Sequence, residues 1–293
     1  MRVTVIANCQ ARPVADYLRL LGRDVEIVDI IITHLAKESD AARLESAAAN
    51  SDFIFAQLVQ PNYPIELVRS STLKERYGDR VLLWPNIFFK GQTPDLCYIT
   101  AASGARVVGP LGDYHSRPLM DAFLAGQSVE NAERGLLQGD FDTSGLTDLV
   151  DSSLDELRRR EQLCEVGVTD LIAEFWRERR CFFTFNHPAA ELMLAVAGRL
   201  LSRADKPPKL VLQGSHVGEP LSPFVPPTWP AIADALQLKF PTSTSSRGVP
   251  VAFPGGRTLL GSGAAYYSSI DLVKMFFHCY EAQRNLLSSC RIT

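Results

Sequence analysis

The chain has 293 residues, of which 46% are hydrophobic and 22% charged, so it can form a packed core and is too apolar for a disordered protein. Thirty basic residues against 33 acidic ones give a net charge of −3, which argues against a nucleic-acid-binding protein that relies on bulk electrostatic attraction. The six cysteines lie far apart without metal-ligand spacing, so we expect reduced thiols and no metal site. The first residues lack a secretory signal and no apolar run has the length of a membrane segment, which favours a cytoplasmic protein.

The first element is a β-branched strand over residues 3–7, followed by Asn8-Cys9-Gln10. Apolar residues then recur at the spacing of one helical face, at Val14, Tyr17, Leu18 and Leu21. The pattern predicts a strand, a tight turn that holds Cys9, and a helix.

Further strands are predicted over 25–32, 53–58 and 80–85, with a helix over 36–49 between the first two. Strands that alternate with helices indicate an α/β fold with a parallel sheet flanked by helices. Right-handed crossovers place the carboxyl ends of such strands along one edge, where ligands gather.

The remaining chain is expected to complete one domain, 1–293, whose α/β core comprises about 1–118 and 180–215. A large helical insertion is predicted over about 119–180, with Ser153 and Glu156 spaced as a capping box. A strand over 181–185 runs into Asn186-His187-Pro188 and a helix over 191–201. A Pro-rich loop region, 216–262, with a short helix near 229–238, and a C-terminal helix, 268–288, follow.

Cys9 is the best candidate nucleophile, because a cysteine between a strand and a helix lies near the positive end of the helix dipole, which favours the thiolate. The amides of Asn8 and Gln10 are candidate donors to an oxyanion. The alternative is that Cys9 is a small buried apolar residue, which is our interpretation of Cys97, Cys164, Cys181, Cys279 and Cys290.

His187 is the first candidate for a base beside Cys9, since it follows a strand and Asn186 is placed to orient its ring or to cap the next helix. His115 is second, with Asp113 two residues away. His34 and His216 follow as third choices, and His278 is interpreted as a face residue of the last helix. The alternative for each is a structural histidine.

Single cations suited to scattered phosphates are Arg12, Lys90 and Arg117, although each is also typical of a solvated surface. The Gly-rich stretches 255–257 and 261–263 match neither the dinucleotide fingerprint nor the P-loop and are interpreted as turns.

Three strings between about residues 3 and 190 together resemble the WcbI-type capsular polysaccharide biosynthesis enzymes: Val5-Ile6-Ala7-Asn8-Cys9-Gln10-Ala11, Trp84-Pro85-Asn86-Ile87-Phe88-Phe89-Lys90-Gly91 and Phe182-Phe183-Thr184-Phe185-Asn186-His187-Pro188. Ala7 replaces a glycine that is common in the opening turn of such proteins. The layout is also similar to SGNH-type hydrolases and to Rossmann-like sheets, with Cys9 and His187 where those hydrolases carry a nucleophile and a histidine. The usual serine after the first strand and an Asp just before His187 are absent.

The resemblance implies an O-acetyltransferase that takes an acetyl group from acetyl-coenzyme A and gives it to a hydroxyl of a capsular or surface polysaccharide or its precursor. Cys9 and His187 are the expected centre, with Asn8 and Gln10 at the oxyanion, His115 as the second histidine, and Arg12, Lys90 and Arg117 at the coenzyme phosphates. Attack by Cys9 and direct attack by the sugar hydroxyl both fit. The Pro-rich region is a candidate wall of the acceptor site.

Two other functions remain open at this stage. One is a carbohydrate esterase of the SGNH type that uses the same centre with water as the acceptor. The other is a non-catalytic subunit that binds coenzyme A or a glycan and associates with a capsule assembly complex.

Overall fold

The structure is a computed structural model that describes residues 1–210, 212–214, 217–287 and 290–292. The chain divides into two compact units, each made of three segments. Unit 1 comprises Met1–Phe88, Leu154–Glu174 and His187–Leu221, and unit 2 comprises Phe89–Ser153, Phe175–Asn186 and Ser222–Thr293. Cys9 and His187 therefore belong to the same unit.

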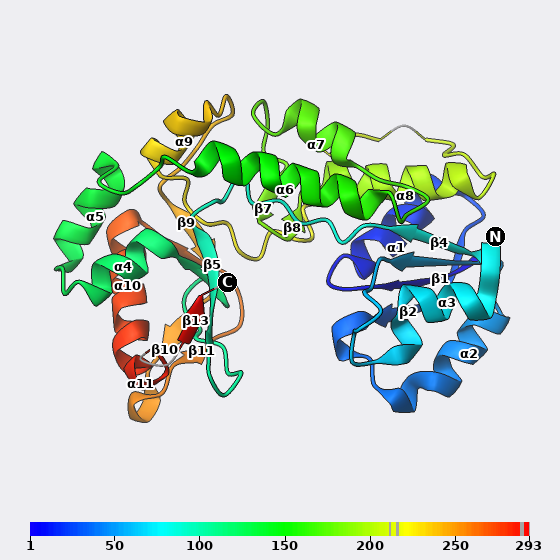
Figure 1. Cartoon of the computed structure of the whole chain (residues 1–293), viewed down its shortest axis with the longest axis horizontal. Helices are drawn as coiled ribbons and strands as arrows, with labels where there is room; N and C mark the ends of the chain where they lie inside the picture. The colour runs from blue at the N-terminus through cyan, green and yellow to red at the C-terminus, as the bar shows by residue number, and fades with distance from the viewer. Residues whose placement is uncertain (211, 215–216, 288–289, 293) are drawn as a thin grey trace. The chain divides into compact units, whose positions relative to one another are not determined.

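A four-stranded parallel sheet forms the centre of unit 1 (Figure 1). Its strands lie in the order β2-β1-β3-β4, and each neighbouring pair is parallel. Their bounds are β1 (Arg2–Ala7), β2 (Glu26–Ile32), β3 (Phe53–Gln57) and β4 (Val81–Trp84). This confirms the predicted parallel α/β sheet, and each observed strand starts or ends within one residue of the predicted range.

Helices pack against both faces of this sheet. The sheet residues Ile6, Ile31, Ile54 and Ala56 form one apolar cluster with α2 (Ala41–Ala49) and α3 (Ser70–Tyr77). On the opposite face, α1 (Ala11–Leu21) packs against β1, β2 and α8 (Ala190–Arg203). Because β1, β3 and β4 are covered on both sides, their sequences are nearly continuous apolar runs.

The chain order creates a switch point at the carboxyl ends of β1 and β3. From β1 the chain moves through α1 to β2, and it then returns past β1 through α2 to β3 and through α3 to β4. Crossover connections that run in opposite directions across the sheet place their helices on opposite faces. Ligands of such sheets bind in the crevice between the carboxyl ends of the two strands at the switch point. Cys9 follows β1 directly at this point.

Unit 1 also contains short turns of 3-10 helix and two further helical segments. These elements are η1 (Thr33–Leu35), η2 (Glu38–Asp40), η3 (Glu66–Val68), η4 (Gly78–Arg80), the second half of α6 (Leu146–Glu161), most of α7 (Thr169–Phe175) and the two-residue strand β8 (His187–Pro188). Helix α6 begins seven residues before Ser153, so the predicted capping box is wrong: Ser153 lies inside the helix, and its Oγ accepts a hydrogen bond from the Lys90 N–H.

Unit 2 contains a three-stranded antiparallel sheet in the order β13-β5-β6, formed by β13 (Cys290–Ile292), β5 (Leu96–Ala101) and β6 (Tyr114–Ser116). None of these strands was predicted. The other elements of the unit are α4 (Arg117–Leu124), α5 (Val129–Gln138), β7 (Phe182–Thr184), α9 (Pro230–Leu236), β9 (Ser246–Gly248), β10 (Val251–Ala252), η6 (Pro254–Gly256), β11 (Leu259–Leu260), β12 (Ala265–Tyr267), α10 (Ser269–Ala282) and α11 (Arg284–Leu287).

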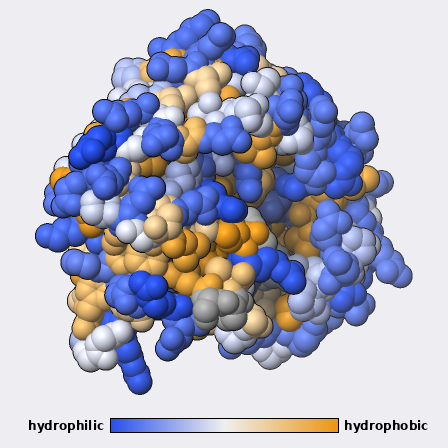
Figure 2. Space-filling model, turned by 60° about the vertical axis from the view of Figure 1, so that its left-hand side comes forward, coloured by the Kyte–Doolittle hydropathy of each residue, from blue (hydrophilic) through white to orange (hydrophobic). Residues whose placement is uncertain are grey.

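The described part of the Pro-rich region holds only short elements, as the prolines predict, and the predicted C-terminal helix is two helices, α10 and α11. Hydrophilic side chains cover much of the face in Figure 2, with apolar side chains between them. Among the large apolar side chains exposed in unit 2 are Leu259, Leu260 and Tyr266. In the ranges that the structure describes, no helix combines the length and the apolar character needed to cross a membrane.

Candidate functional site

The turn between β1 and α1 is shaped by Asn8. Its Oδ1 accepts a hydrogen bond from the backbone N–H of Gln10 at 3.0 Å, and its backbone carbonyl accepts one from Ala11 at 3.1 Å. An asparagine side chain readily accepts a hydrogen bond from the backbone N–H two residues later, and this bond mimics a backbone turn and stabilises it. Cys9 is thereby held between the strand and the first residue of the helix.

The Cys9 thiol is half-buried and donates a hydrogen bond to Asn8 Oδ1 at 3.7 Å. Burial raises its pKa above the ordinary value of 9.0, although a backbone hydrogen bond at Cys9 acts in the opposite direction. Burial therefore outweighs this hydrogen bond and disfavours the thiolate, and the predicted influence of the helix terminus on Cys9 stays a prediction.

Gln10 is fully buried, and its side chain is used inside the protein. Gln10 Nε2 donates to the carbonyl of Ile87 at 3.2 Å, and Gln10 Oε1 accepts from Gln57 Nε2 at 2.9 Å. Gln57 Oε1 in turn accepts from the backbone N–H of Asn8 at 3.2 Å. The predicted oxyanion role of Gln10 is wrong, because a side chain without exposed surface cannot reach a substrate; Gln10 instead ties the turn to the ends of β3 and β4.

The Asn8 side chain is also not oriented as the predicted oxyanion donor. Its Oδ1 lies toward the thiol, and its Nδ2 donates to Asn86 Oδ1 at 3.4 Å. The oxygen that it presents to Cys9 would repel an oxyanion, so Asn8 is interpreted as a residue that holds the thiol in place. Asn86, which follows β4, was not predicted as a site residue, although it lies within one of the family-like strings.

Helices α1 and α8 run parallel, side by side. At their C-terminal ends, a methyl group added at Gly198 would lie 4.0 Å from Leu21 Cδ1, and one added at Gly22 would lie 3.6 Å from Leu201 Cδ1. Leu21 and Gly198 are therefore neighbours. The same number of residues before them lie Pro13, in the first turn of α1, and Ala190, the first residue of α8, so these two residues are level. Cys9 and His187 each precede the first turn of their helix, so both lie at the same edge of unit 1.

Residues 218–219 join α1 to the N-terminal end of α8. The Tyr17 hydroxyl on α1 donates to the Gly218 carbonyl at 3.2 Å, and Glu219 Oε2 accepts from the backbone N–H of Ala190 at 2.7 Å. Glu219 therefore caps α8, which is one of the two roles that the sequence left open for Asn186. A carboxylate at a helix N-terminus is favourable because it satisfies an unpaired N–H near the positive end of the dipole.

His187 is buried, with 9% of its surface exposed, and burial lowers its pKa to about 4. Its ring is therefore neutral near pH 7 and able to accept a proton. Asn186 lies in unit 2, where its Oδ1 accepts from the Tyr114 hydroxyl at 2.7 Å and its Nδ2 donates to the Tyr98 hydroxyl at 3.2 Å. The hydrogen bond of the Cys9 thiol to the His187 ring stays a prediction.

His115 is not a site residue. Its ring is fully buried in unit 2, with Nδ1 at 3.2 Å from the Tyr280 hydroxyl and Nε2 at 3.0 Å from the Val107 carbonyl. Both nitrogens are thus engaged, and Asp113, the predicted orienting residue, is exposed. Burial lowers the pKa of His115 to about 4, as it does for His187, so the contacts of both ring nitrogens, and not the pKa, identify His115 as a structural histidine.

The three predicted cations have different environments. Arg12 is exposed in the first turn of α1 and makes no ion pair with any residue that the structure describes. Lys90 is half-buried, with Nζ 5.8 Å from the centre of the Phe185 ring in unit 2. Arg117 is paired with Asp121 at 2.9 Å and borders a pocket of about 540 Å³ that also contains Asp140 and Asp142. These carboxylates disfavour an anion, and the phosphate role of Arg117 stays a prediction.

Neither His34 nor His278 has a contact that connects it to Cys9 in the described part of the chain. His34 is exposed in η1, and His278 lies on α10 with its ring against Phe253. His216 lies outside the described residues.

Comparisons with known proteins agree on one family. The family described as "Polysaccharide biosynthesis enzyme WcbI" matches residues 2–209. A solved structure of WcbI, a polysaccharide biosynthesis enzyme, is 19% identical and superposes with a TM-score of 0.67 over 98% of both chains, which shows a common fold. The description of that structure specifies that a disulfide bond between coenzyme A and one of its cysteines is absent. No curated protein sequence matches the chain significantly.

Proposed function

Because this chain belongs to the WcbI family of polysaccharide biosynthesis enzymes, we propose that it transfers an acetyl group from acetyl-coenzyme A to a hydroxyl of a capsular or other surface polysaccharide, or of a precursor of it. The observation that carries the proposal is the parallel start of α1 and α8, which puts a thiol and a neutral imidazole at one edge of unit 1. The mention of coenzyme A and a cysteine for the WcbI structure supports the choice of donor.

In the proposed reaction His187 takes the proton of the Cys9 thiol while the sulfur attacks the thioester carbonyl. The bond between the carbonyl carbon and the coenzyme sulfur breaks, and the proton on His187 passes to the leaving coenzyme thiolate. The sugar hydroxyl then attacks the acetyl carbonyl on Cys9 and loses its proton to His187. The bond between the carbonyl carbon and the Cys9 sulfur breaks, and His187 returns the proton to the leaving Cys9 thiolate. Since burial keeps Cys9 protonated, the base is essential to this route.

Arg12 supports the binding of coenzyme A, because it is exposed one turn away from Cys9 without an acidic partner in the described ranges. An arginine in this state retains all five donors for a phosphate. Lys90 belongs to unit 2, and its role as a phosphate ligand stays a prediction.

The test is a single turnover with acetyl-coenzyme A and no acceptor, quenched in acid and analysed by peptide mass spectrometry. Cys9 should carry an acetyl group in the wild type and none in Cys9→Ala, whereas Cys164→Ala, which removes another half-buried cysteine of unit 1, should leave Cys9 acetylation unchanged. His187→Ala should slow the step by about 10²–10⁴, the usual contribution of a general base.

The alternatives give different results. Transfer to glycan acceptors without an acetylated Cys9 would replace the two-step route by direct attack of the sugar hydroxyl. Hydrolysis of acetylated glycans that does not depend on coenzyme A would identify an esterase. Binding of coenzyme A in calorimetry, without turnover on any acceptor of a glycan panel, would identify a binding subunit.

A further inference from the structure

The two residues after Pro85, Asn86 and Ile87, form a short segment that is held from two sides. On one side the β1–α1 turn contacts both residues, through Asn8 Nδ2 to Asn86 Oδ1 at 3.4 Å and through Gln10 Nε2 to the Ile87 carbonyl at 3.2 Å. On the other side Arg160 Nη1, on α6, donates to the Asn86 carbonyl at 3.2 Å. The segment therefore links α6 to the turn that carries Cys9.

Arg160 is itself fixed by Glu156, one turn earlier on α6. Arg160 Nε donates to Glu156 Oε1 at 2.8 Å, and the Arg160 side chain is only 21% exposed. Hydrogen bonds from Arg159, together with those from Arg160, hold the pKa of Glu156 at about 2, so the carboxylate is charged at any working pH. A planar guanidinium with one edge on a carboxylate presents its remaining donors in a set direction, here toward the Asn86 carbonyl.

We propose that Arg160 is a positioning residue for the reaction at Cys9, acting through Asn86 and Asn8. Arg160 fixes the backbone of Asn86, the Asn86 side chain fixes the amide of Asn8, and Asn8 Oδ1 accepts the hydrogen bond of the Cys9 thiol. Every member of this chain of contacts belongs to unit 1. The inference rests on the proposed function for its catalytic meaning.

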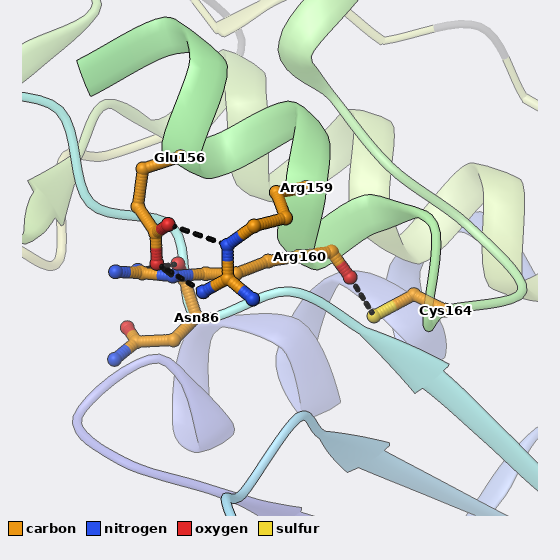
Figure 3. Close-up of polar contacts among 5 residues, drawn as sticks. All are labelled: Asn86, Glu156, Arg159, Arg160 and Cys164. Atoms are coloured by element: carbon orange, nitrogen blue, oxygen red, sulfur yellow. Dashed lines mark hydrogen bonds and ion pairs between the residues drawn. The ribbon is translucent and has the colours of Figure 1, made fainter. Parts of the chain in front are cut away.

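Helix α6 supplies a matched control. Arg159 pairs with the same carboxylate, through two bonds of 2.8 Å to Glu156, but it is 59% exposed and makes no contact with Asn86 in the described structure. Figure 3 shows both arginines at Glu156, with Asn86 close to Arg160. Replacing either arginine removes one charge and one ion pair from α6, and only the Arg160 change disconnects Asn86.

The experiment compares Arg160→Met, Arg159→Met and Asn86→Ala in the full-length chain, with Arg160→Lys as a milder variant. Acetyl transfer from acetyl-coenzyme A gives kcat and KM, and peptide mapping gives the rate at which iodoacetamide alkylates Cys9. Because small displacements in an active site cost up to about 10²-fold in rate, we expect Arg160→Met to lower kcat by about tenfold or more with little change in KM for the coenzyme. Arg159→Met should retain wild-type kcat and alkylation rates.

The double variant Arg160→Met/Asn86→Ala tests the route. If Arg160 acts through Asn86, the two changes are not additive, and the double variant is little slower than the worse single variant. Additive effects, or equal losses in Arg159→Met and Arg160→Met at unchanged melting temperature, would overturn the proposal. If Arg160→Met does not fold, Arg160→Lys and Asn86→Ala carry the same comparison, since lysine lacks the fork that engages Glu156 and Asn86 together.

The alkylation measurement separates this inference from the proposed function. A wild-type protein that transfers no acetyl group, but whose Cys9 alkylation changes in Arg160→Met and not in Arg159→Met, would refute the transferase and support the positioning chain. If the wild type transfers acetyl groups but neither kcat nor the rate of Cys9 alkylation changes in Arg160→Met, only the positioning role of Arg160 is refuted.

Discussion

The buried imidazole of His187 makes the stability of the protein depend on pH. Its pKa is about 4 in the folded protein against an ordinary value of 6.5, and the cause is burial. Above pH 6.5 the ring is neutral in both states and contributes no pH dependence. As the pH falls below 6.5 the unfolded chain binds a proton that the folded protein does not, so the folded state loses stability until about pH 4.

The size of this effect follows from the two pKa values. A difference from 6.5 to about 4 corresponds to about 3 kcal/mol once the pH is below both values. At pH 5 the loss relative to pH 8 is about 2 kcal/mol, because the folded ring is still mostly neutral there. His115, with a pKa lowered to about 4 in the same way, contributes a similar loss of its own.

The assay is urea unfolding of the wild type and His187→Gln at pH 8 and at pH 5, followed by circular dichroism. Glutamine has no proton to gain in this range, so the variant should lose about 2 kcal/mol less than the wild type between the two pH values, while the His115 share remains. His34→Gln is the control for replacing an exposed histidine.

Two results would contradict the reasoning. One is a His187→Gln variant whose stability falls between pH 8 and pH 5 as steeply as that of the wild type. The other is kinetic: a neutral base of low pKa keeps kcat/KM level from pH 8 to about 5, so an acid limb centred near pH 6.5 would show that His187 is solvated like an ordinary histidine.

Two further changes test the packing around the site and in unit 2. Gln57→Ala removes the partner of the buried Gln10 side chain and should lower the free energy of unfolding by about 1–3 kcal/mol in urea titrations; an unchanged midpoint would show that the turn does not need this contact. Gly112→Ala brings a methyl group to 2.7 Å from the Phe224 ring at a φ of +65°, whereas Gly126→Ala has a similar φ of +71° and open space. The Gly112 variant should therefore melt lower than the Gly126 variant, and equal melting temperatures would refute the close approach.

The sheet of unit 1 and the place of Cys9 in it were predictable because the signals are local. A β-branched run, an asparagine that closes a turn and an apolar stripe of helical period all lie within the first 21 residues. The position of His187 before α8 was predictable from the same local pattern of a strand, a turn and a helix. By contrast, β5 pairs with β13 across almost 190 residues of sequence, Ala101 facing Cys290, and no local pattern indicates this partner.

The chemistry of individual side chains was less predictable than their place. Gln10 follows Cys9, where an oxyanion donor is expected, but its side chain is fully buried and bonds to residues 47 and 77 positions away in the sequence. The acidity of the Cys9 thiol depends on how much water the surrounding chain excludes, which sequence position does not reveal. Arg160 was hidden because an arginine on a helix resembles any solvated charge until its contact with Asn86 is seen.

The way in which the segments of the two units alternate along the chain has a consequence for biogenesis. During synthesis the four-stranded sheet of unit 1 can form early, because its strands come first in the sequence. Helix α8 and its capping residue Glu219 are synthesised only after part of unit 2. The strand that closes the second sheet, β13, is synthesised later still. Neither unit can therefore be expressed as a contiguous fragment, and a long-lived, incompletely folded nascent chain, with apolar surface open to chaperones, is the expected state during synthesis.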